Sequence, residues 1–219
     1  MFIGHFAVGF AAKRAAPQAS LGWLVAAAVF LDLLWPVFLL LGWERVRIAP
    51  GDTVFTPLAF ESYPISHSLA AVAGWSIVLG TIYWVLKRYR AGGWAVGLLV
   101  ASHWVLDVIT HRPDLPVYPG GPMMGFGLWS SPIATVTVEA LMFLVGIFLY
   151  MRGTRAVDNV GRWGWWGFIA LLTVVFVMNA MGAPPPSVSA IAYAGILGGG
   201  LSVFLAWWVD QHRRSADAA

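Results

Sequence analysis

Residues 93–111 read GWAVGLLVASHWVLDVITH, a stretch long and apolar enough to cross a membrane as one helix, although it contains three ionisable residues. These residues, His103, Asp107 and His111, are four positions apart. On a helix this spacing places them on one face, with adjacent Cβ atoms about 5–6 Å apart. Ionisable groups inside a membrane need a partner, so three metal-ligand side chains on one face favour a bound metal ion.

The composition of the whole chain is that of an integral membrane protein. Of its 219 residues, 59% are hydrophobic and only 11% are charged, whereas soluble domains have about 25% charged residues. The chain has no cysteine, which excludes disulfides and thiolate metal sites. The net charge of +3 comes from short loops and not from a basic patch, so we expect no nucleic acid partner.

Six segments of about twenty mostly apolar residues predict an all-α membrane protein with about six transmembrane helices. They are residues 20–42, 66–86, 93–111, 132–151, 163–181 and 190–209. Residues 2–12 are apolar but too short to span, and predict an N-terminal half-helix. We expect a single membrane domain over residues 1–219, with the site in residues 1–151 and a two-helix scaffold in residues 160–212.

The basic residues predict the orientation of these spans. Ten of the thirteen flank one set of helix ends, and only three flank the other. By the positive-inside rule the first set of ends is cytoplasmic, as are both termini, and residues 43–65 and 112–131 form outer loops. We expect a bacterial inner (plasma) membrane protein. The acidic residues of the first outer loop, Glu44, Asp52 and Glu61, are most simply solvated.

This topology places seven candidate metal ligands between the bilayer midplane and the outer face. Three of them are carboxylates. Inserting all three into the membrane without a partner would cost a free energy on the order of 8–10 kcal/mol. No Lys or Arg lies inside a predicted span to pair with them. The candidates are His5, Asp32, His67, His103, Asp107, His111 and Glu139.

Nitrogen and oxygen ligands without sulfur suit Zn, with Mn and Fe as alternatives. Seven candidates exceed the needs of one ion, so either two ions lie about 3.5–4 Å apart or some residues only orient the ligands. Asp32 or Glu139 could instead act as a general base. His67 follows Pro64 at the membrane edge and is either a ligand or an interfacial residue.

Other residues near the predicted site are candidates for contact with a substrate. Ser68 is a candidate catalytic residue that could contact substrate or a metal ligand, and Ser66 could be the N-cap of a helix. We expect no Ser66–His67 nucleophilic pair, because neighbouring side chains on a helix do not face each other. In the second outer loop, either an ordinary linker or a lid, Arg112 could bind a phosphate or carboxylate and Trp129 a lipid tail.

Four motifs in the first half of the chain carry a family resemblance. They are Gly4-His5, Phe30-Leu31-Asp32, Ser66-His67-Ser68, and Ser102-His103 followed by Asp107. In this order they resemble the inner-membrane metal-dependent hydrolases described as LexA-binding and, more distantly, the zinc-dependent phospholipase C group. The resemblance implies a helical, metal-dependent hydrolase with its site at the matching His and Asp residues.

The chain departs from that family pattern at two places. The family commonly has a further acidic residue and a His after the position of Asp32, and a His before the position of Ser66, where this chain has Leu33-Leu34-Trp35 and Tyr63-Pro64-Ile65. His111 and Glu139 are the candidate replacements. The LexA association is not expected to carry over, so no obligate protein partner is implied.

The leading hypothesis is a membrane-embedded metal-dependent hydrolase that acts on a lipid or lipid-linked phosphate or ester in the outer half of the bilayer. One alternative is a transporter or channel for metal ions or protons that uses the same residues. The polar residues of a transport route should continue to the cytoplasmic face, whereas the candidate residues of this chain stop near the predicted midplane. The other alternative is a non-catalytic membrane scaffold.

Overall fold

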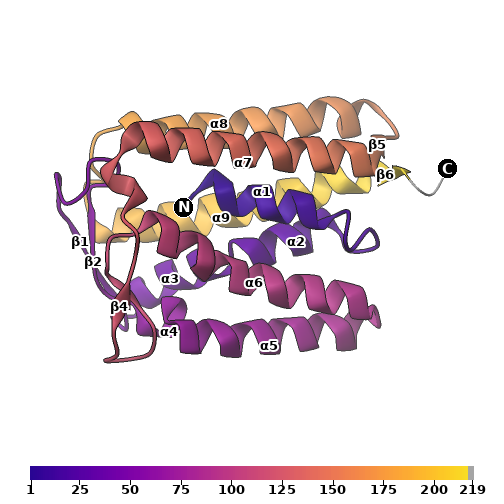
Figure 1. Ribbon diagram of the computed structural model, residues 1–219. Helices are drawn as coiled ribbons and strands as arrows, with labels where there is room; N and C mark the ends of the chain where they lie inside the picture. The colour runs from indigo at the N-terminus through magenta and orange to yellow at the C-terminus, as the bar shows by residue number, and fades with distance from the viewer. Residues whose placement is uncertain (217–219) are drawn as a thin grey trace.

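The computed structural model describes residues 1–216 and shows a mostly helical chain, with the long helices lying alongside one another (Figure 1). Five helical segments are long and apolar enough to cross a membrane. They are α5 (Leu69–Lys87), α6 (Arg90–Thr110), α7 (Pro132–Gly153), α8 (Trp165–Met181) with the π-helical turn η2 (Val160–Gly164) before it, and α9 (Val188–Gln211). The predicted helical class and the apolar helices of spanning length are therefore confirmed.

The first predicted span in the chain is broken. Residues 20–42 were expected to form one helix, but they form α2 (Leu21–Ala28) and α3 (Phe30–Leu40), bent by 56°. The interruption is at Val29, whose backbone has φ −103° and ψ 14°. A helix end leaves carbonyl groups without partners inside the helix, so the break makes backbone acceptors available within an apolar segment.

The short N-terminal helix is α1 (Ile3–Ala12), and it packs mainly against α7, α2 and α6. Its approach to α7 is close: a Cβ added at Gly146 would lie 2.7 Å from the Cα of Ala7. Aromatic side chains, centred on Phe10, fill the space between α1, α7 and α8. This packing holds the N-terminal segment, with His5 on it, inside the bundle.

Short strands close the two ends of the bundle, and none of them was predicted. At one end lie the antiparallel hairpin β1 (Arg45–Ile48) with β2 (Leu58–Ser62), the ladder of β3 (Leu115–Pro116) with β4 (Met123–Met124), the short helix α4 (Pro64–His67) and the 3₁₀ turn η1 (Leu128–Ser130). At the other end, where α5 also turns into α6, β5 (Thr154–Ala156) pairs with β6 (Arg213–Ser215) (Figure 1).

A buried ion pair near the β5–β6 end joins segments that are far apart in sequence. Lys13 Nζ donates to Asp210 Oδ2 at 2.7 Å and to the carbonyl of Ala19 at 2.8 Å. The hydroxyl of Tyr150 on α7 donates to Asp210 Oδ1 at 2.8 Å. Because both carboxylate oxygens have donors, Asp210 connects α9 to α7 and to the segment after α1.

Candidate metal centre

The centre is built on α6, where His103 and Asp107 lie one turn apart and are both buried. Their side chains meet, with His103 Nε2 at 3.1 Å from Asp107 Oδ2. The same face of α6 includes Val96, Leu99 and Val100, which pack in the core. The helical spacing that predicted this pair therefore places it at the inner face of the bundle.

The break between α2 and α3 fixes the protonation of His103. Its Nδ1 atom lies 2.8 Å from the carbonyl oxygen of Ala28, the last residue of α2. A carbonyl can only accept, so Nδ1 carries a proton and, in a neutral imidazole, Nε2 has a free lone pair. Among residues 1–216, Nε2 has no hydrogen-bond partner. The Ala28 carbonyl thus directs the lone pair of His103 toward Asp107.

A second relay fixes the protonation of His67. The Glu44 carboxylate accepts hydrogen bonds from the amides of Ile65 and Ser66, each at 2.8 Å, and from the Ser66 hydroxyl at 2.6 Å. Because the only hydroxyl proton of Ser66 goes to Glu44, Ser66 Oγ accepts from His67 Nδ1 at 2.7 Å. His67 Nε2 is then free to act as a ligand.

The two Nε2 atoms face the same pair of carboxylates. His103 Nε2 lies 3.6 Å from Asp32 Oδ1, and His67 Nε2 lies 3.7 Å from that atom and 3.8 Å from Asp107 Oδ2. Lone pairs of nitrogen and oxygen repel one another unless a proton or another cation lies between them. The arrangement therefore suits a cation, and histidines held through Nδ1 are typical of metal sites.

His5 approaches the same cluster from α1. Its Nε2 atom lies 3.1 Å from Asp107 Oδ1, and its ring stacks on that of His103 with centroids 3.7 Å apart. The Met1 amino group also contacts Asp107 Oδ1, at 2.6 Å. Two overlapping sets have donor atoms within 4.8 Å of one another and could hold a metal ion. They are His5, His103 and Asp107, and Asp32, His67 and His103.

A small pocket of about 80 Å³ opens onto this cluster. Asp32, His67 and Asp107 line it, together with aromatic side chains that include Trp35 and Trp129. The Asp32 side chain is 45% exposed, in contrast to the buried Asp107. A cavity needs about 10–15 Å³ on this measure to hold one water, so the pocket has room for an ion with bound waters.

Neither His111 nor Arg112 belongs to the cluster. His111 is the C-cap of α6 with an extended backbone, so it leaves the helical face on which it was predicted, and its Nδ1 atom lies 2.9 Å from Asp114 Oδ1. It lines the pocket with Trp129, whose ring centroid is 4.3 Å away, but it belongs to neither candidate set. Arg112 pairs with Asp52 at 2.6 Å and with Asp114 at 3.1 Å.

Glu139, a predicted ligand or base, instead caps the start of α1. Its Oε2 atom accepts from the amides of Phe2 at 2.8 Å and Gly4 at 3.2 Å. Its Oε1 atom is buried and has no hydrogen-bond partner among the described residues. A carboxylate is favourable at a helix N-terminus, where unpaired amides and the helix dipole meet it. Glu139 thus positions the segment that carries His5.

The Ser66-His67-Ser68 motif also differs from expectation. Ser68, considered a candidate catalytic residue, is the N-cap of α5: its hydroxyl donates to the carbonyl of Pro64 at 2.6 Å and accepts from the amide of Ala71 at 3.2 Å. Ser66 was expected to be the cap and not to meet His67, yet the two side chains are bonded. The single-turn helix α4 ends at His67, so the spacing of a long helix does not apply there.

Sequence reasoning missed Glu44. It was expected to be a solvated loop charge, but it is 1% exposed and has three hydrogen-bond donors. The contact joins residues 22 positions apart across the β1–β2 hairpin, which the sequence pattern does not predict. The only sequence signal for a buried acceptor near Ser66 was Pro64, the first residue of the short helix α4. The amides that follow it at the start of the helix need an acceptor from outside the helix.

Comparisons of the chain with protein-family models, with curated proteins and with solved structures found no match.

Proposed function

We propose that the chain spans a membrane through its five long helices and the bent α2–α3 pair, and that His67, His103 and Asp107 hold a divalent metal ion there, with Asp32 beside it as the general base. The observation that supports this most strongly is the pair of imidazoles with protonated Nδ1 atoms, whose Nε2 atoms face two carboxylates. Zn²⁺ fits the nitrogen and oxygen donors best, with Mn and Fe as alternatives.

The proposed activity is hydrolysis of a lipid or lipid-linked phosphate or ester. A metal ion bound at this centre would polarise the substrate and lower the pKa of a bound water. The half-exposed Asp32 carboxylate faces the pocket and would accept a proton from that water. Trp35 and Trp129 would contact the apolar part of the substrate, and Asp107, which also contacts His5, would hold the centre in place.

The distribution of basic residues supports an outward-facing site. The ends of α5 and α7, the start of α6, the turn η2 before α8, and the strands β5 and β6 carry most of the Lys and Arg residues and lie at one end of the bundle (Figure 1). This end would be cytoplasmic by the positive-inside rule. The pocket residues His111 and Trp129 lie toward the opposite end, where an outer-leaflet substrate would reach them.

The experiment measures product release from a panel of phospholipids and isoprenoid phosphates and esters by mass spectrometry, using purified protein in vesicles. Wild-type protein should release product, a chelator should stop this, and Asp32→Asn should slow it by at least about 10²-fold, as expected for loss of a general base. Asp158→Asn, which alters a carboxylate on an exposed loop, is the control and should keep the wild-type rate.

Folded, metal-loaded wild-type protein that hydrolyses no member of the panel would argue against the activity. Metal uptake into the vesicles, abolished by Asp32→Asn, would support the transport alternative instead.

A further inference from the structure

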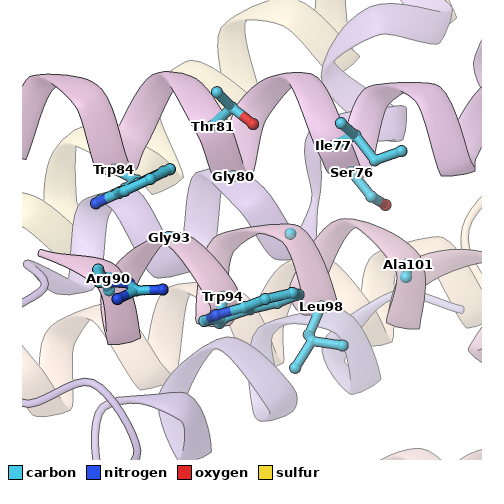
Figure 2. A pocket seen from close by; sticks show the side chains of 11 residues that line it. Ser76, Ile77, Gly80, Thr81, Trp84, Arg90, Gly93, Trp94, Leu98 and Ala101 are labelled. Carbon is cyan, nitrogen blue, oxygen red and sulfur yellow. The ribbon is translucent and has the colours of Figure 1, made fainter.

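A second pocket lies outside the candidate metal centre, between α5 and α6. It has a volume of about 360 Å³, within the usual range for small-molecule sites of about 300–1,000 Å³. Figure 2 shows its walls: Ile77 and Trp84 come from α5, and Trp94 and Leu98 from α6. Trp94 is 72% exposed, so this is a groove on the outer surface of the bundle.

The groove exists because the two helices pack closely beneath it. A Cβ added at Gly80 would lie 2.8 Å from the carbonyl oxygen of Gly93, and one added at Gly97 would lie 3.0 Å from that of Ser76. Glycines at these positions bring the backbones together and leave a floor without side chains. The large side chains on either side then form the walls.

The length of the groove corresponds to one leaflet of a bilayer. Its α6 lining runs from Arg90, the first residue of the helix, to Ala101 near the middle. At 1.5 Å per residue this is about 16 Å, whereas half of a hydrocarbon core is about 15 Å thick. His103 and Asp107 lie in the other half of α6 and face the core, so the groove is separate from the metal centre.

One end of the groove is positively charged. The Arg90 guanidinium lies 5.7 Å from the centroid of the Trp84 ring at the end of the groove, and Lys87 and Arg88 are exposed in the same turn. None of the ion pairs within residues 1–216 involves these three residues. No acidic side chain is among the eleven described residues that line the groove.

We propose that this groove binds one anionic phospholipid of the cytoplasmic leaflet. One acyl chain lies over the glycine floor between Trp94 and Ile77, and the headgroup phosphate pairs with Arg90. Arg binds phosphate with a planar set of donors, and basic residues at the cytoplasmic surface attract anionic lipids. The proposal requires a membrane-embedded chain but is independent of the metal and of hydrolysis.

The test is a titration of delipidated protein in detergent with phosphatidylglycerol and with phosphatidylcholine of the same acyl chains, followed by native mass spectrometry. The wild-type protein should bind one phosphatidylglycerol in preference to phosphatidylcholine. Arg90→Gln should weaken binding of phosphatidylglycerol about fivefold, as expected for one basic residue near a membrane surface. Arg152→Gln is the matched control, because Arg152 lies over an aromatic ring at the corresponding end of α7 but outside the groove.

A second variant tests the apolar part of the groove. Ala101→Trp fills its inner end and should weaken binding of both lipids, with an unchanged unfolding transition showing that the fold is intact. Equal affinity of the wild-type protein for the two lipids, or equal effects of Arg90→Gln and Arg152→Gln, would overturn the proposal. A lipid-independent dimer that Ala101→Trp dissociates would also overturn it, since a second copy would then occupy the groove.

Discussion

At the scale of residues, His67 and His103 both direct Nε2 toward the same two carboxylates. They differ in the group that accepts a hydrogen bond from Nδ1. A backbone carbonyl at a helix break accepts from Nδ1 of His103, and a buried Glu–Ser pair accepts from Nδ1 of His67. In both cases the partner of Nδ1 determines that Nε2 is available to a metal. The two partners are therefore as important to the proposed centre as the ligands themselves.

Glu44→Gln tests this role of the second relay. The new amide group would donate to Ser66 Oγ instead of accepting from it, so Ser66 would turn its proton to His67 Nδ1 and move the imidazole proton to Nε2. We expect the affinity for Zn²⁺, measured by competition with a chelating dye, to fall about 10–100-fold. Glu61→Gln alters an exposed ion pair with Arg47 and should leave the affinity for Zn²⁺ unchanged. Equal affinities of the two variants would contradict the relay.

The sequence predicted the core of this cluster because helical spacing and the need of buried carboxylates for a partner are local rules. They identified His103 and Asp107 as a pair on one helix face, and the predicted topology placed His5, Asp32 and His67 at a similar depth. They did not identify Glu44, because its contact with Ser66 depends on how the β1–β2 hairpin folds back. They also assigned Glu139 to the site, although it caps α1 from a distant helix.

At the scale of elements, α6 was predicted over residues 93–111 and runs from Arg90 to Thr110. It therefore begins three residues earlier and ends one residue earlier than predicted. The break between α2 and α3 was not predicted, since residues 20–42 are mostly apolar, with Asp32 as the only charged residue, and Pro36 lies well after the bend. A buried break in an apolar segment persists only where other groups use its free backbone atoms. Here His103 supplies the donor, which the local sequence of the segment does not show.

Gly146→Ala tests how strictly α1 is held against α7. The added Cβ would meet the backbone of Ala7, so α1, with His5 on it, must move. We expect a loss of stability on the order of 1–3 kcal/mol, seen as a lower midpoint of thermal unfolding in detergent. Gly74→Ala is the control on α5, where a Cβ would meet no atom of the described chain within 4 Å; it should be neutral or stabilising by up to about 1 kcal/mol. Equal midpoints would contradict the close packing.

At the scale of the whole molecule, the bundle separates its polar groups along its length. Near one end the Lys13–Asp210 pair is fully hydrogen-bonded and joins three segments. Toward the other end His103 Nε2 is buried without a hydrogen-bond partner among the described residues, and Asp32, His67 and Asp107 line a pocket. The apolar segments predicted the long helices, but not the strands that close both ends, because these are short and lie in loops without strong periodicity.

The metal content of the purified protein tests the central claim most directly. Elemental analysis should find about one divalent metal ion, most simply Zn, for each folded chain. His103→Ala should lose the ion while keeping a cooperative unfolding transition. His212→Ala, which removes an exposed imidazole paired with Asp158, should keep it. Folded wild-type protein that contains no divalent metal, and binds none when Zn²⁺, Mn²⁺ or Fe²⁺ is added, would contradict the account.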